Sequence, residues 1–175
     1  MEIIALIIGL IAVAFYLLGY LQKKKTSILV LNLVSRLLYI LQYILLGAFS
    51  GAVLDVAGAL VTVVAGKKES RFIKRYRIAV IIVMNLVIIG SGIYIMIATS
   101  DALGVLPIIG VMCHTNAFWF DKEKSVRRLS MVGSPFWFAY NMLSGAYGSC
   151  IGDLLSMVSI GVSMYRYDRK KDADD

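Results

Sequence analysis

The sequence contains few of the residues on which catalytic and metal sites usually depend. Among its 175 residues there is one histidine, His114, and there are two cysteines, Cys113 and Cys150. A zinc site needs several cysteine, histidine or carboxylate ligands at short, regular spacing, which this chain does not supply. Both cysteines fall inside apolar segments, so we expect buried free thiols and no disulfide framework. No glycine-rich phosphate loop and no pair of nucleophile and base can be recognised, so the sequence predicts no metal, no cofactor and no enzymatic activity.

Charged residues are scarce as well. They make up 17% of the chain, whereas 59% of the residues are hydrophobic and the mean hydropathy is +0.80. A soluble domain of this size needs more polar residues to cover its surface, so lipid is the expected solvent. Several apolar runs approach the length of about 20 residues that a helix needs to cross a bilayer, and none alternates polar and apolar residues like a barrel strand. The sequence therefore predicts an all-α membrane protein whose seven transmembrane helices are residues 3–21, 28–47, 49–66, 78–98, 102–120, 129–146 and 148–165.

The basic residues indicate the orientation of these helices. Every lysine and arginine except Arg36 lies at the end of an apolar run, in the segments 23–25, 67–77, 122–128 and 166–171, and the alternate connections contain none. The positive-inside rule places such segments in the cytoplasm, which puts the N-terminus outside and the C-terminus inside. The first run has no basic residues before it, unlike a signal peptide, so we expect it to be retained. Anionic lipid headgroups account for the net charge of +7 without a nucleic-acid partner.

The chain is similar to itself at an offset of 98 residues. Without a gap, residues 41–71 align with 139–169, and Asp55 aligns with Asp153. We interpret this as the duplication of a three-helix unit. The two units start four helices apart and so have the same orientation, related by a pseudo-two-fold axis along the membrane normal. The expected organisation is 3+1+3: residues 1–71 form the first unit, 72–100 the linker helix, 101–169 the second unit and 170–175 a cytoplasmic tail.

Three ionisable residues lie inside the predicted helices, where each costs about 2.5–3.5 kcal/mol to insert and needs a partner or a wet cavity. They are Arg36, Asp55 and Asp153. In a duplicated chain the two aspartates face each other across the axis, and we expect Arg36 to pair with one of them. Three interpretations stay open, of which two are a central polar site with a titratable carboxylate and an ion pair that only fixes helix packing. A third is that one aspartate reaches the outer surface.

Further polar and aromatic residues are expected close to this layer. They are Tyr39, Gln42, Trp137, Tyr140 and Asn141. Aromatic rings beside amides and a carboxylate are typical of a pocket for a sugar, a nucleoside or an amino acid, although Trp137 fits helix packing equally well. His114 is a possible proton relay, and a hydrogen bond to a neighbouring helix is the alternative for it.

The plan of three, one and three helices with an external N-terminus resembles the SWEET, PQ-loop and KDEL-receptor superfamily. Within it, the stretches LQYILLGAFSGA and PFWFAYNMLSGAYG are most similar to the YgjV-type bacterial inner membrane proteins. This resemblance implies a location in the bacterial inner membrane. SWEETs and related vitamin-precursor transporters are facilitators, which favours transport by analogy. The chain departs from SWEETs because it has no clear PQ dipeptide, and only Pro107 and Pro135 are available as hinge prolines.

The leading hypothesis is therefore a facilitator or proton-linked carrier of a small polar metabolite, with a cavity between the two units. One alternative is a receptor that uses the same cavity to bind a ligand without transporting it. Another is a membrane scaffold or assembly factor whose polar residues are structural. Because both units belong to one chain, a monomer can form the path, and a homo-oligomer is equally compatible with the sequence.

Overall fold

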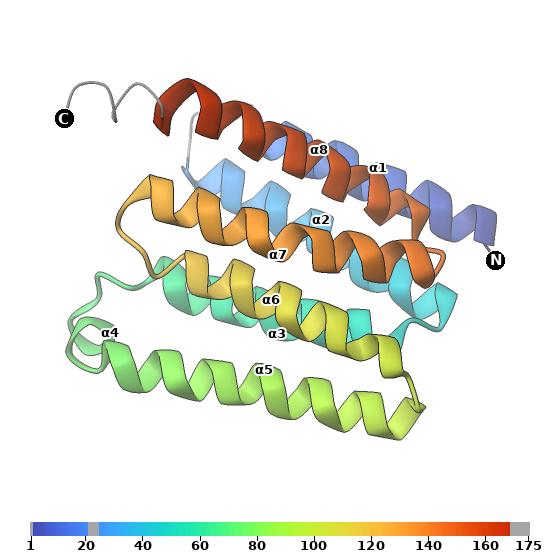
Figure 1. Ribbon diagram of the computed structural model, residues 1–175, viewed down its shortest axis with the longest axis horizontal. Helices are drawn as coiled ribbons and strands as arrows, with labels where there is room; N and C mark the ends of the chain where they lie inside the picture. Colours follow the sequence, from blue (N-terminus) through green and yellow to red (C-terminus); the bar gives the residue numbers. More distant parts are fainter. Residues whose placement is uncertain (1, 21–24, 169–175) are drawn as a thin grey trace.

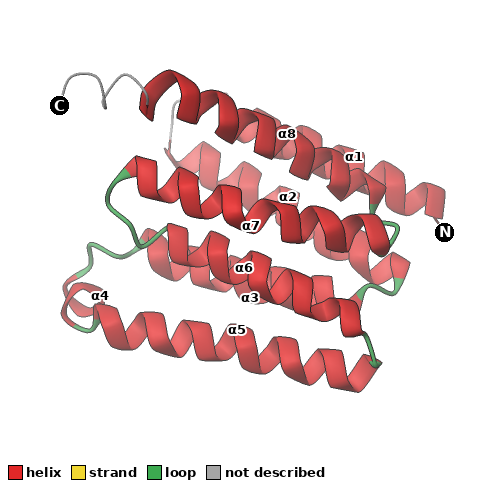
Figure 2. Cartoon of the chain, in the orientation of Figure 1, coloured by secondary structure: helices red, strands yellow, loops and turns green. Residues whose placement is uncertain are grey.

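The computed structural model describes residues 2–20 and 25–168. This part of the chain is helical, with eight α-helices and no strand (Figure 2). The predicted tail at 170–175, together with Lys23 and Lys24 of the first basic segment, lies outside the described residues.

The helices follow one another through short connections. They are α1 (Glu2–Tyr20), α2 (Lys25–Leu46), α3 (Phe49–Gly66), α4 (Arg71–Arg75), α5 (Arg77–Thr99), α6 (Val105–Ala117), α7 (Glu123–Leu143) and α8 (Tyr147–Ser163). A 3₁₀ turn, η1 (Ala102–Gly104), precedes α6, and a π-helical turn, η2 (Met164–Asp168), follows α8.

All helices except the short α4 run roughly along a common direction in one bundle (Figure 1). The most extensive contacts are those of α1 with α2 and of α6 with α7. α8 packs against α1 and α7, and α3 packs against α2, α5 and α6. α5 therefore lies at one edge of the bundle, and α1 and α8 lie at the opposite edge (Figure 1).

The outer surface of this bundle is apolar. In α5, the side chains of Ile78, Leu86 and Ile97 are 75%, 62% and 71% exposed, and only two residues of the helix are buried. Contiguous exposed aliphatic side chains of this extent indicate lipid rather than water as the surroundings. By length and composition, the described helices that can cross a bilayer are α3, α5 and the segment Tyr147–Arg166 that contains α8. Shorter apolar helices are found at Glu2–Leu18, Leu33–Leu46 and Ala102–Ala117.

The basic connections gather at one end of the bundle. Figure 1 shows the α3–α5 connection, the α6–α7 connection and the end of α8 there, and the α2–α3, α5–α6 and α7–α8 turns at the other end. The connections at the first end contain the basic segments 67–77 and 122–128, and we call it the basic end. Connections with and without basic residues alternate along the sequence, and the structure places the two kinds at opposite ends of the bundle (Figure 1).

The structure corrects the bounds of several predicted helices. The helix predicted at 102–120 is shorter, because η1 occupies its start and α6 ends at Ala117. The amides of residues 118–120 donate to the carbonyls three residues earlier, at 3.3, 3.2 and 3.1 Å. This is the hydrogen-bond pattern of a 3₁₀ turn, which ends the α-helix. The helix predicted from residue 129 begins at Glu123, because charged residues before an apolar run are good helix formers. No helix was predicted for α4, whose N-cap is Ser70.

The α2–α3 and α7–α8 turns have the same backbone conformation. Gly47 and Gly145 have φ values of +70° and +74°, a left-handed region that suits glycine at a helix C-terminus. The alanines that follow have φ and ψ of −82° and 61° at Ala48, and of −81° and 58° at Ala146. Each alanine amide donates to the carbonyl five residues earlier, at 2.9 and 2.8 Å. The two turns, 98 residues apart, are therefore closed by the same hydrogen bond.

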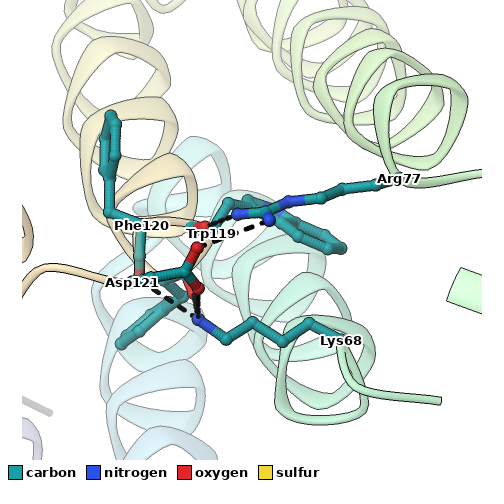
Figure 3. A network of polar contacts seen from close by, with 6 residues as sticks. Lys68, Arg77, Trp119, Phe120 and Asp121 are labelled. Atoms are coloured by element: carbon teal, nitrogen blue, oxygen red, sulfur yellow. Dashed lines mark hydrogen bonds and ion pairs between the residues drawn. The ribbon is translucent and has the colours of Figure 1, made fainter. Parts of the chain in front are cut away.

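At the basic end, the α6–α7 connection is tied to the segments on either side of α4 (Figure 3). Lys68 Nζ donates to Asp121 Oδ1 at 3.0 Å and to the carbonyl of Phe120 at 3.1 Å. Arg77 donates to the carbonyl of Trp119 and lies 3.5 Å from Asp121 Oδ2. The two cations thus satisfy backbone carbonyls in the connection that follows α6, and positive charge is favourable near the C-terminus of a helix. The hydrogen bond and charge of Lys68, followed by the charge of Arg77, lower the pKa of the Asp121 carboxyl below its usual range.

We expect the stabilising effect of Asp121 to depend on pH. Because its pKa is lower in the folded state, its contribution to the free energy of unfolding is present above the unfolded pKa of about 3.9 and is lost as the pH falls through the folded value. Asp121→Asn should thus lower the melting temperature slightly at pH 7, and this difference from wild type should decrease as the pH falls below about 3.9. The effect is small because the carboxyl is exposed. A difference that stays constant down to pH 3 would show that the pairing with Lys68 does not contribute.

Candidate functional site

A cavity of about 130 Å³ lies among α1, α2, α3, α6, α7 and α8. Its volume is below the roughly 300–1,000 Å³ of pockets for drug-sized ligands and leaves room for a small solute or a few water molecules. α5 contributes no residue to its wall. The lining residues are Tyr16, Ser35, Arg36, Tyr39, Tyr43, Asp55, Val111, His114, Ser134, Trp137, Asn141, Ser149, Gly152, Asp153 and Ser156.

Arg36 of α2 and Asp55 of α3 form an ion pair in the wall of this cavity. Arg36 Nη1 donates to Asp55 Oδ1, and the two side chains are 26% and 10% exposed. Gly58, one turn further along α3, lets Val111 of α6 approach, since a Cβ at this position would lie 2.7 Å from Val111 Cγ2. The expected pairing of Arg36 with one of the two aspartates is therefore found at Asp55.

Asp153 of α8 is held by an amide instead of a cation. Its Oδ2 accepts a hydrogen bond of 2.7 Å from Asn141 Nδ2, and Asn141 Oδ1 accepts one of 2.8 Å from the hydroxyl of Tyr43. Tyr43 and Asn141 are buried, so this chain of hydrogen bonds links α2, α7 and α8 within the bundle. Among the described residues, no lysine, arginine or histidine forms an ion pair with Asp153.

Aromatic rings form another part of the wall. The rings of Tyr43 and Trp137 stack, with centroids 6.2 Å apart and an interplanar angle of 25°. Gly110 of α6 lets the indole approach, because a Cβ there would lie 2.6 Å from Trp137 Cδ1. Gly152 of α8 does the same for Tyr39, whose hydroxyl oxygen would lie 2.5 Å from an added Cβ. Larger side chains at these two glycines would displace the rings that line the cavity.

Most of the site residues predicted from the sequence are brought together here. Those that line the cavity are Arg36, Tyr39, Asp55, His114, Trp137, Asn141 and Asp153. Gln42 and Tyr140 lie in the packed interior beside it, where the Tyr140 hydroxyl accepts from the amide of Gly51 at 2.9 Å. Gln42 Oε1 accepts from the hydroxyl of Ser149 at 2.7 Å. The structure therefore places these two residues in contacts between helices and not in the cavity wall.

His114, predicted as a possible proton relay, faces the cavity from α6. Its Nε2 lies 3.5 Å from the hydroxyl oxygen of Ser134, at the long limit of a hydrogen bond. The imidazole is thus available to a solute in the cavity as well as to α7.

Sequence reasoning missed most of the hydroxyl groups in the wall. Tyr16 of α1 and Ser156 of α8 share a hydrogen bond of 2.6 Å, and the Ser35 hydroxyl donates to the carbonyl of Ala12 at 2.8 Å. The 98-residue offset could have indicated Tyr16, because it aligns with the predicted site residue His114. The remaining serines gave no signal, since small hydroxyl residues are common wherever transmembrane helices pack closely.

In the part of the chain that the structure describes, no three histidine, cysteine or acidic side chains lie close enough together to hold a metal ion. The cavity offers one guanidinium, two carboxylates, an imidazole and several hydroxyl and aromatic groups. Such groups can form hydrogen bonds with a small polar solute and balance its charge.

Apolar helices packed around a polar interior define the class of the molecule, an integral membrane protein. Residues 3–171 match the model of the Imp-YgjV family, described as bacterial inner membrane protein. The chain therefore belongs to this family, as its resemblance to the YgjV-type proteins indicated. No curated protein and no solved structure matches the chain.

Proposed function

We propose that the protein is a facilitator or proton-linked carrier of a small polar metabolite, and that the cavity is its binding site. Charged and polar groups in a membrane interior are expensive and commonly mark a solute pathway. The Arg36–Asp55 pair, Asp153 and His114 all border one space instead of being dispersed through the bundle. A space of this composition is suited to a polar solute that must leave water to cross the bilayer.

The proposed topology is the 3+1+3 arrangement of seven membrane-spanning helices. α1–α3 belong to the first unit (1–71), α5 is the linker (72–100) and α6–α8 belong to the second unit (101–169). The helix contacts support this division, because α1–α2, α2–α3 and α1–α8 correspond to α6–α7, α7–α8 and α6–α3. The matching turns at Gly47 and Gly145 support it as well. The positive-inside rule places the basic end in the cytoplasm and the N-terminus outside.

The observation that carries the proposal is that residues 98 positions apart meet at the cavity. Tyr43 and Asn141, which are equivalent in the repeat, share a hydrogen bond of 2.8 Å. Equivalent residues approach each other only near the axis that relates two units, which is where parallel-repeat transporters bind their solutes. The aligned pairs that line the cavity are Tyr16 with His114, Arg36 with Ser134, Tyr39 with Trp137, Tyr43 with Asn141, and Asp55 with Asp153.

Solute uptake into vesicles that contain the purified protein tests this function. We expect saturable flux of at least one small polar solute, and we expect the double variant Asp55→Asn, Asp153→Asn to lose most of it. Asp121→Asn is the matched control, since it removes a carboxylate at the basic end, outside the cavity. Equal flux through wild type and the double variant, for every solute tried, would count against a carrier. Saturable binding without flux would instead select the receptor hypothesis.

A further inference from the structure

The charges that line the cavity do not balance. The described lining residues include one arginine and two aspartates, and the histidine among them is taken as neutral at pH 7. Arg36 and Asp55 compensate each other in their ion pair. This leaves the carboxylate of Asp153 without a counter-charge from the described residues.

The geometry around Asp153 leaves its carboxylate accessible to a cation in the cavity. The amide of Asn141 bonds only its Oδ2, and the orientation of this amide is set by the Tyr43 hydroxyl, which donates to Asn141 Oδ1. Asp153 Oδ1 has no hydrogen bond from the described residues and belongs to a side chain that lines the cavity. A carboxylate in low-dielectric surroundings requires compensation by a bound cation or a proton.

The rest of the wall favours an organic cation. Tyr39, Tyr43 and Trp137 border the same cavity, and aromatic faces attract ammonium groups when water is excluded. The volume of about 130 Å³ is close to that of an engineered cavity of about 150 Å³ that accommodates benzene. It therefore suits a molecule of about six or seven non-hydrogen atoms, larger than a bare metal ion.

We propose that the cavity binds a small monovalent organic ammonium ion, with Asp153 as its counter-ion and the rings of Tyr39, Tyr43 and Trp137 around its alkyl groups. This inference rests on the proposed carrier function and names the chemical class of its solute. An anion would meet the uncompensated carboxylate, and a neutral solute would leave it unpaired.

Choline and its neutral carbon isostere, 3,3-dimethylbutan-1-ol, provide the test, with glycine betaine as a zwitterion of similar size. Binding to the purified full-length protein is measured at pH 7.5 by calorimetry and by the shift in melting temperature. Choline should bind about tenfold or more tightly than the isostere, the ratio expected from the charge-dependent part of ammonium recognition. Glycine betaine should bind more weakly than choline, because its carboxylate adds a negative charge.

Asp153→Asn should raise the Kd for choline by about tenfold or more, whereas Asp121→Asn should leave it unchanged. The comparison of choline with its isostere is made within the wild type, so it is decisive even when Asp153→Asn does not fold. Equal binding of the three probes, or unchanged choline affinity in Asp153→Asn, would overturn the inference. A wild type that binds none of them would overturn it too and leave a proton as the partner of Asp153.

Flux measurements separate this inference from the function on which it rests. Choline binding by a protein that transports none of the solutes tried would remove the carrier proposal and leave the ammonium site. Flux of a neutral solute by a protein that does not prefer choline to its isostere would leave the carrier proposal and remove the ammonium site.

Discussion

Arg36→Ala is expected to destabilise the protein strongly, by about 3–5 kcal/mol, which is the usual effect of removing one partner of a buried ion pair. The variant leaves the Asp55 carboxylate, 10% exposed in the wild type, without its cation inside the bundle. The melting temperature of the detergent-purified protein should fall accordingly, and less protein should be recovered from membranes.

The matched control is Arg71→Ala, which removes an exposed arginine from α4 and should leave the melting temperature nearly unchanged. Adding Asp55→Asn to Arg36→Ala removes the unpaired charge, so the double variant should be more stable than Arg36→Ala alone. Comparable melting temperatures for Arg36→Ala and Arg71→Ala would show that the ion pair contributes little. A double variant less stable than either single variant would show that the two residues act independently.

Gly148→Ala should also be strongly destabilising. A Cβ at this position in α8 would lie 2.7 Å from the Cα of Gly9 in α1, and backbone atoms cannot move aside as a flexible side chain can. α1 and α8 must then separate, and overpacking of this kind typically costs about 1–3 kcal/mol. Gly148 lies in the first turn of α8, so alanine gains at most the roughly 1 kcal/mol that it brings to a helix interior, and this offsets only part of the cost. The melting temperature should therefore fall.

Gly161→Ala is the control within the same helix. No described atom lies within 4 Å of a Cβ at Gly161, so only the helix propensity of alanine remains, and the melting temperature should stay constant or rise. If both substitutions raised the melting temperature alike, the close contact between α1 and α8 would be absent from the protein in solution.

Much of the helical fold follows from the lengths of the apolar runs. α3 was predicted with its observed bounds, and the start of α8 was placed within one residue, because a glycine turn ends the preceding apolar run in each case. The end of α6 was misplaced by three residues. The carbonyls of Trp119 and Phe120, just after the helix, instead accept hydrogen bonds from Arg77 and Lys68, which come from a distant part of the chain. Such long-range capping leaves no local pattern in the sequence.

The candidate site was predictable to the extent that the repeat identified it. The 98-residue offset paired Asp55 with Asp153 and placed Arg36 close to them, and the structure brings all three to one cavity. Gln42 was expected in the wall because it follows Tyr39 by about one turn. It instead contacts Ser149, because the rotation of α2 about its own axis depends on packing against α1 and α3. Sequence spacing does not determine that rotation.

Arg36 aligns with Ser134, so its charge has no counterpart in the second half of the chain. An assembly of two identical three-helix chains has every residue twice around its axis, so the charge that its central residues contribute is an even number. The described residues around this cavity include one guanidinium and two carboxylates, an odd total. In the proposed 3+1+3 arrangement, the two units differ in sequence where Arg36 aligns with Ser134, so a single unmatched charge can lie on the axis between them.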